Sequence, residues 1–265
     1  MKLTRIDLNS WILQIAGQTV LIDPWLVDPM VFYGQPWLFT AYHTTPPVFT
    51  PTTLPAPDLI LLSQGLDDHC HKPTLQQLDR NIPVVGSKTA VATVQGLGYA
   101  TVTCLTPGET YISGEMSITA VPGAPLQGQV ENGYLLKDRE TGETVYYEPH
   151  LCQLEKVTAH LAEVVDVAIA PVVGQVFPLL GQVVMGPNEA MNLVKTLRPR
   201  VFVPTALGEI QMSGLLPKLI RSVGSVEQFR DQLAASGLST KLLLPDPGET
   251  LELELSGRVE ERSLQ

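Results

Sequence analysis

Long hydrophobic runs and runs of basic residues are both missing from this chain of 265 residues. Gly, Pro or a charged residue interrupts each apolar stretch well before the roughly 20 residues that a helix needs to cross a bilayer, so we predict no membrane span. Lys and Arg number 17 against 27 Asp and Glu, which gives a net charge of -10. This charge opposes binding to nucleic acid or to an anionic membrane unless the few basic residues cluster, so we expect no nucleic acid partner.

Paired cysteines and a targeting leader are missing as well. The three cysteines, Cys70, Cys104 and Cys152, form an odd number without zinc-ribbon spacing, and no charged and then apolar leader precedes the first strand. Both observations favour a reducing cytoplasm as the location. A hydrophobic fraction of 44% supports a substantial core. Because no repeat or linker divides the chain, we expect a single domain over residues 1–265.

Three common catalytic motifs are also absent. The sequence contains no Gly-x-Ser-x-Gly elbow, no Gly-x-Gly-x-x-Gly after a strand and no Gly-Lys-Ser/Thr loop, which argues against an α/β-hydrolase, a dinucleotide enzyme and a P-loop NTPase. What is present is the segment LILLSQGLDDHCH at residues 59–71. Its four apolar residues predict a buried strand that ends in a polar loop, and Pro73 indicates the start of a helix. Proteins of the α/β type usually carry their chemistry in such loops.

The remaining chain alternates strand and helix patterns. Residues 3–23 predict an antiparallel hairpin, and residues 100–147 predict a series of strands joined by Gly-containing turns. Helices are predicted to begin at Pro187 and at Ser225, where Gln228 three residues later completes a capping pattern. This order is typical of two sheets packed face to face with helices outside. We therefore predict an α+β fold, a four-layer αββα sandwich.

Two apolar segments stand out between these elements. Residues 28–57 contain seven prolines and six aromatic residues, so we predict an irregular segment that covers its own domain, a subunit interface or a substrate. Residues 176–185 form a second apolar loop, interpreted as a mobile wall or a dimer contact. Either segment could support a homo-oligomer, and together they could form an entrance for a hydrophobic small-molecule ligand.

Several blocks of the sequence resemble one known family. The segment SQGLDDH at residues 63–69 resembles the T/S-H-x-H-x-D-H motif of the metallo-β-lactamase superfamily. The segment TVLIDPWL at residues 19–26 is similar to the second strand and following loop of its lactonase-like and phosphodiesterase-like branch. Residues 166–172 and 185–190 are similar to later blocks of that branch. The resemblance implies the metallo-β-lactamase fold and metal-dependent hydrolysis.

The resemblance also implies a metal site, from which this chain departs. Gln64 and Leu66 stand where the motif has its first two histidines, and neither side chain binds zinc in the manner of an imidazole. Asp68 and His69 keep the motif positions of two ligands. Where a later block of the family has a bridging aspartate, this chain has Glu148 and His150 instead. The resemblance therefore implies a remodelled site with at most one metal ion.

Glu148 and His150 are candidate ligands because Pro149 favours an extended chain, in which residues two apart project to the same side. With Asp68 and His69 they would supply two imidazoles and two carboxylates, a set adequate for one Zn²⁺, Mn²⁺ or Fe²⁺. Alternatively, these four side chains bond to one another and bind no metal.

Asp67 and Asp68 are candidate catalytic residues, because adjacent carboxylates can raise one pKa enough for acid or base catalysis. Two functions therefore stay open. The first is a hydrolase that uses one metal ion to hydrolyse an ester, a lactone or a phosphodiester. The second is a non-catalytic family member that has lost its metal and binds a small molecule or a protein partner.

Overall fold

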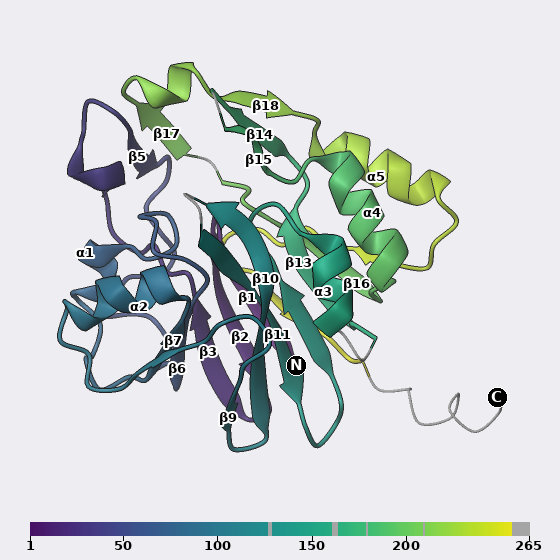
Figure 1. Cartoon of the computed structure of the whole chain (residues 1–265), viewed down its shortest axis with the longest axis horizontal. Helices are drawn as coiled ribbons and strands as arrows, with labels where there is room; N and C mark the ends of the chain where they lie inside the picture. Colours follow the sequence, from purple (N-terminus) through teal and green to yellow (C-terminus); the bar gives the residue numbers. More distant parts are fainter. Residues whose placement is uncertain (127–128, 161–163, 179, 209, 256–265) are drawn as a thin grey trace.

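Two large β-sheets pack face to face and carry helices on both outer faces in the computed structural model of this chain (Figure 1). The structure describes residues 1–126, 129–160, 164–178, 180–208 and 210–255. The four layers confirm the αββα sandwich that the order of predicted elements indicated. Within these residues, no helix has the length and apolar character needed to cross a membrane.

The first sheet contains both antiparallel and parallel strands. In spatial order its strands are β20 (Thr250–Glu252), β1 (Lys2–Asp7), β2 (Ser10–Ile15), β3 (Gln18–Ile22), β6 (Leu59–Leu62), β7 (Val84–Gly86) and β8 (Val102–Cys104). The antiparallel pairing of β1, β2 and β3 confirms the predicted opening hairpin. The strands from β3 to β8 are parallel, so their carboxyl ends share one edge. Helices α1 (Lys72–Leu75) and α2 (Lys88–Gln95) follow β6 and β7.

The second sheet has the same mixed character. In spatial order its strands are β19 (Lys241–Leu242), β16 (Val201–Thr205), β13 (Val167–Pro171), β12 (Thr144–Tyr147), β11 (Gln129–Asp138), β10 (Met116–Leu126) and β9 (Thr110–Ser113). Helices α3 (Leu154–His160), α4 (Pro187–Leu197) and α5 (Val226–Ala235) belong to this half of the chain. The Ser225 hydroxyl accepts the backbone N–H of Gln228 at 3.1 Å, which confirms the predicted cap.

The hydrophobic core lies between the two sheets. Leu13, Val20 and Leu61 of the first sheet belong to one buried cluster with Ile118 and Val145 of the second. Two further clusters pack α2 against the outer face of the first sheet, and α4 and α5 against the outer face of the second. Strands covered on both faces have no polar side to present, which explains the uninterrupted apolar sequence of β6.

Hydrogen bonds join the two sheets at the carboxyl edge of their parallel strands. The indole N–H of Trp11 donates to the Thr205 hydroxyl at 2.9 Å, and the Tyr147 hydroxyl donates to the Asp23 carboxylate at 2.7 Å. Because Asp23 follows β3 and Tyr147 ends β12, these bonds bring the loops after the two strands together. Polar loop residues from both halves of the chain therefore meet at this edge.

Two small sheets lie beyond this edge and correct two predictions. Residues 28–57 are not wholly irregular, because β4 (Met30–Val31) and β5 (Thr40–His43) pair in one sheet with β17 (Ile210–Ser213). A 3₁₀ turn, η1 (Phe32–Gly34), follows β4. Residues 176–185 belong largely to a hairpin of β14 (Gly174–Phe177) and β15 (Gly181–Val184), paired with β18 (Arg221–Val223). In both cases two strands of the segment pair with each other, and a strand distant in sequence, β17 or β18, adds a further neighbour.

Replacing Leu61 by Ala tests the packing between the sheets. Leu61 is fully buried, so the variant should lose about 2–5 kcal/mol of unfolding free energy through lost burial and a residual cavity. Urea unfolding followed by circular dichroism measures the change. Ile112→Ala is the matched control, because Ile112 is 58% exposed on β9 and should change stability by no more than about 0.5 kcal/mol. Equal losses in both variants would contradict this location of the core.

Candidate metal centre

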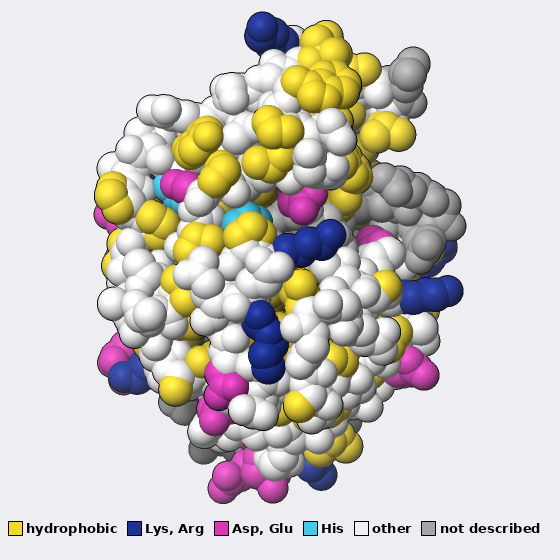
Figure 2. All heavy atoms as spheres, turned by 90° about the vertical axis from the view of Figure 1, so that its left-hand side faces the viewer, with side chains coloured by type: hydrophobic (Ala, Val, Ile, Leu, Met, Phe, Trp, Pro, Cys, Tyr) yellow, Lys and Arg dark blue, Asp and Glu magenta, His cyan; other side chains and the backbone are white. Residues whose placement is uncertain are grey.

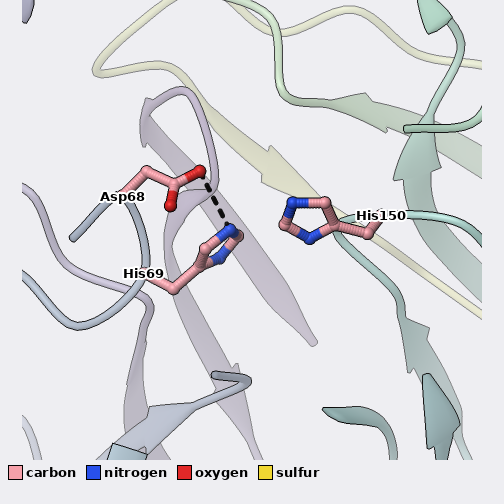
Figure 3. A group of neighbouring side chains, drawn as sticks. All are labelled: Asp68, His69 and His150. Carbon is pink, nitrogen blue, oxygen red and sulfur yellow. Dashed lines mark ion pairs between the residues drawn. The ribbon is translucent and has the colours of Figure 1, made fainter. Parts of the chain in front are cut away.

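Three of the predicted ligands lie together at the carboxyl edge of the sheets. Asp68 and His69 come from the loop after β6, and His150 comes from the chain after β12. One potential ligand atom from each residue lies within 4.8 Å of the other two. Figure 3 shows the His150 ring pointing toward His69 from the opposite side of the site, and the two ring centroids are 4.8 Å apart.

A buried carboxylate, Asp23, positions the His69 ring. Oδ2 of Asp23 accepts a bond from Nδ1 of His69 at 2.8 Å, from the Ser63 hydroxyl at 2.5 Å and from the Tyr147 hydroxyl at 2.7 Å. The backbone N–H of Ser63 donates to Oδ1 at 2.8 Å. Because a carboxylate only accepts, the His69 hydrogen sits on Nδ1. Nε2 is thus the ring nitrogen that faces the site.

Asp68 lies against this second nitrogen. Oδ2 of Asp68 is 3.1 Å from Nε2 of His69, and this ion pair is drawn in Figure 3. Burial by itself lowers the pKa of His69, but Asp68 and Asp23 outweigh it and raise the pKa to about 10. Burial would raise the pKa of Asp68, yet His69 and, to a lesser degree, His150 hold it below its usual value. Without a metal ion, His69 is therefore an imidazolium between two carboxylates.

His150 is held differently. Its Nδ1 lies 2.5 Å from Nε2 of Gln64, and its backbone N–H donates to Oε1 of Glu148 at 2.9 Å. Burial, helped by the nearby positive charge of His69, lowers the pKa of His150 to about 3, so the ring is neutral at pH 7. Burial also raises the pKa of Glu148 to about 8. Neutral His150 is in the protonation state that a metal ligand requires.

The buried polar atoms of this cluster fit a bound cation. Oδ1 of Asp68 and Oε2 of Glu148 are buried and make no hydrogen bond, and Nε2 of His69 has the Asp68 carboxylate as its partner. Each such atom costs about 1–3 kcal/mol when nothing replaces its water. A divalent cation takes imidazole nitrogen and carboxylate oxygen as ligands and displaces the ligand protons on binding. The donor set present here therefore suits one Zn²⁺, Mn²⁺ or Fe²⁺.

Two predicted site residues occupy other positions. Glu148 is outside the group of three, and its Oε1 accepts the backbone N–H of His150. Oδ2 of Asp67 accepts the backbone N–H of Tyr33 at 2.8 Å and so joins the loop after β6 to η1. Burial raises the pKa of Asp67, although the bond from Tyr33 opposes the shift. The ligand role of Glu148 and the catalytic role of Asp67 stay predictions.

Sequence reasoning did not select Asp23, Tyr147 or Gln64 as parts of this site. Asp23 directly follows the buried strand β3, and a charged residue in that position is a signal that could have indicated a site residue. Tyr147 belongs to a strand of four buried residues and gives no such signal. Gln64 was interpreted through the histidine that it replaces, and its contact with His150 depends on how the two sheets pack.

Two mixed β-sheets between layers of helices, with a cluster of histidine and carboxylate side chains at one edge, are the arrangement expected of a metallohydrolase-like protein. The comparison with known families agrees, because the family described as Beta-lactamase superfamily domain matches residues 2–206. The chain belongs to this family, as the motif at residues 63–69 and the segment at residues 19–26 had indicated.

Individual proteins are similar along nearly the whole chain. Two are named UPF0173 metal-dependent hydrolases, one from Thermodesulfovibrio yellowstonii and one from Methanopyrus kandleri. The first is 25% identical over 90% of this chain and 86% of its own length. The second is 25% identical over 95% and 100%, respectively. A crystal structure described as a possible metal-dependent hydrolase from Veillonella parvula has the same fold, with a TM-score of 0.74, 14% identity and coverage of 96% of this chain and 99% of that one.

Removing the Tyr147 hydroxyl tests the role of the Asp23 network. Tyr147→Phe deletes one of the bonds to a buried carboxylate, so the unfolding free energy should fall by about 1.5–3 kcal/mol. Chemical unfolding measures the change. Tyr42→Phe is the control, since Tyr42 is 44% exposed and should change stability by about 0.5 kcal/mol or less. Unchanged stability in Tyr147→Phe would show that the bond to Asp23 contributes little.

Proposed function

We propose that the chain is a metal-dependent hydrolase whose single metal ion is held by Asp68, His69 and His150. The observation that carries the proposal is the convergence of their three ligand atoms within 4.8 Å, at the edge where both sheets end. The names of the two curated relatives support the same reaction class. Three protein ligands is also the number that catalytic zinc sites use, whereas structural sites use four.

When bound, the metal would lower the pKa of a water molecule and polarise the carbonyl or phosphoryl group under attack. The residues of the chain orient the metal ligands and determine which ring nitrogen carries the hydrogen. Asp23 keeps the His69 hydrogen on Nδ1, so that the Nε2 lone pair is directed into the site. Such a carboxylate partner also makes the imidazole a stronger ligand. Gln64 and the Glu148 carboxyl fix the His150 ring and backbone, respectively, so that the ring faces His69 without a bound ion.

We further propose an ester, lactone or phosphodiester substrate with an apolar part. Figure 2 shows histidine side chains in a hollow that hydrophobic and acidic side chains border. The hydrophobic part of this border would remove water from an apolar group of the substrate and leave the polar part for the reacting bond. A net charge of -10 favours a substrate without a high negative charge.

Elemental analysis of untagged protein purified without chelators tests the metal site. We expect about one equivalent of zinc, manganese or iron per chain, because three donors support one ion. His69→Ala and His150→Ala should each lose the metal and the hydrolysis of p-nitrophenyl esters or bis(p-nitrophenyl) phosphate. Treatment with a chelator should abolish the same activity, and adding the metal back should restore it.

His43→Ala is the matched control for these variants. His43 is also a buried histidine near this edge, but its Nδ1 is paired with Asp28 at 2.7 Å and it lies outside the group of three. This variant should retain the metal. A wild-type protein that holds no metal after incubation with Zn²⁺, Mn²⁺ and Fe²⁺ would contradict the proposed function and favour a binding protein instead.

Glu148→Gln distinguishes a ligand from a supporting residue. The Gln carbonyl can still accept the backbone N–H of His150, so we expect the variant to bind metal within about tenfold of the wild-type affinity. Competition with a chromophoric chelator gives the dissociation constants. A loss as large as that of His69→Ala would instead identify Glu148 as a fourth ligand.

A further inference from the structure

Large hydrophobic side chains are exposed together around the small sheet of β4, β5 and β17 and the neighbouring hairpin. We call this surface the apolar rim, and its members are Tyr33, Trp37, Tyr42, Leu180, Met212, Leu215 and Leu219. Trp37 is the most exposed aromatic residue among them, at 64%. Figure 2 shows hydrophobic side chains gathered on the upper part of the face that carries the histidine hollow. An apolar surface of this kind on a folded chain marks an interaction site.

Hydrogen bonds hold the members of the rim in one place. The backbone N–H of Leu215 donates to the carbonyl of Trp37 at 3.0 Å, so these two exposed side chains come from neighbouring chain segments. Strand β17, which carries Met212, pairs with β5, which carries Tyr42. The turn η2 (Leu216–Lys218) leads from β17 to β18, which pairs with β14 of the hairpin that carries Leu180. Three segments distant in sequence therefore form one surface.

The charge of these three segments differs from that of the whole chain. Residues 29–57, 167–188 and 210–226 contain no Asp or Glu, and their charged residues are Lys218 and Arg221. The chain as a whole carries a charge of -10. These segments thus combine apolar and aromatic side chains with two basic groups, and Asp67, which accepts the backbone N–H of Tyr33, adds one acidic group beside the rim. This composition is complementary to apolar material that carries phosphate groups.

The polar atom of the Trp37 side chain already has a hydrogen-bond partner within the protein. Its indole N–H donates to the side-chain carbonyl of Gln35 at 2.9 Å, so the ring can leave water without losing a hydrogen bond. A second copy of this chain is a poorer occupant, because its rim segments carry the same two basic groups, Lys218 and Arg221, and no phosphate to pair with them.

We propose that the apolar rim binds the surface of a zwitterionic lipid bilayer, with Trp37, Leu215 and Leu219 inserted among the acyl chains and with Lys218 and Arg221 at the lipid phosphates. This inference goes beyond the proposed function and does not depend on a bound metal. It places the histidine hollow beside the membrane surface, because Tyr33 of the rim bonds to Asp67 of the loop that carries Asp68 and His69. An apolar substrate dissolved in the bilayer could then reach the site without crossing water.

Tryptophan fluorescence in the presence of phosphatidylcholine vesicles tests the proposal. Two of the three tryptophans, Trp11 and Trp25, are buried, so a change on vesicle binding reports Trp37. We expect a blue shift of the emission and quenching by brominated phosphatidylcholine. Trp37→Phe should remove both signals and leave the emission of the buried residues unchanged.

Vesicle co-flotation with matched variants measures the binding itself. The triple variant Trp37→Ser, Leu215→Ser, Leu219→Ser should lower vesicle partitioning by at least about 100-fold, since each side chain contributes apolar burial. Ile112→Ser removes an equally exposed apolar side chain from β9 and should change partitioning by less than about twofold.

Two outcomes would overturn the proposal. One is a wild-type protein that neither floats with vesicles nor shifts its fluorescence. The other is a wild-type dimer in sedimentation equilibrium that the triple variant converts to a monomer, without vesicle binding by either protein. In that case the rim would be a contact between copies of this chain. Neither outcome depends on metal content, so the proposed hydrolase function is tested separately.

Discussion

The Asp23 carboxylate is the group on which the site and the packing of the two sheets both depend. It lies at the end of β3 and is fully buried, and it accepts hydrogen bonds from Ser63 after β6, from His69 and from Tyr147 at the end of β12. A buried carboxylate without such partners costs several kcal/mol. The two sheets must therefore pack in one register for Asp23 to be satisfied, and the same register directs His69 into the site.

The sandwich separates an apolar interior from a polar edge. Between the sheets the core is hydrophobic, whereas the carboxyl edge holds Asp68, His69 and His150 close together, with Glu148 bonded to the backbone of His150. Clustering buried titratable groups costs stability, and the core offsets that cost. The opposed pKa shifts of His69 and His150 follow from this arrangement, because two carboxylates outweigh burial at His69, whereas burial, helped by the positive charge of His69, lowers the pKa of His150.

The rim and the site are linked through the loop after β6. Asp67 of this loop bonds to Tyr33, while the next two residues belong to the three-residue cluster. Membrane binding at the rim and metal binding at the site would thus both involve the loop after β6. The local absence of acidic residues in the rim segments is hidden in the net charge of the whole sequence. The net charge of the protein governs its repulsion of charged partners at long range. At a contact surface, only the charged groups within about one Debye length affect binding.

Much of the fold could be predicted from local patterns. The opening hairpin, the buried strand before residue 63, the Ser225 cap and the layered order all follow from hydrophobic periodicity and from turn or cap residues, which act over a few neighbouring positions. The predictions were wrong for residues 28–57 and 176–185, where short strands pair with each other locally and with β17 and β18, which lie far along the chain.

The candidate site divides in the same way. The sequence by itself determined that Asp68 and His69 follow a buried strand and that Gln64 and Leu66 replace two histidines, because these are statements about neighbours along the chain. Only the tertiary structure decided that His150 meets His69, that Gln64 contacts His150, and that Glu148 bonds to the backbone instead of joining the group of three. Each of these contacts crosses between the two sheets or depends on side-chain direction at a loop. Such distances are set by how the whole core packs, and no local pattern encodes them.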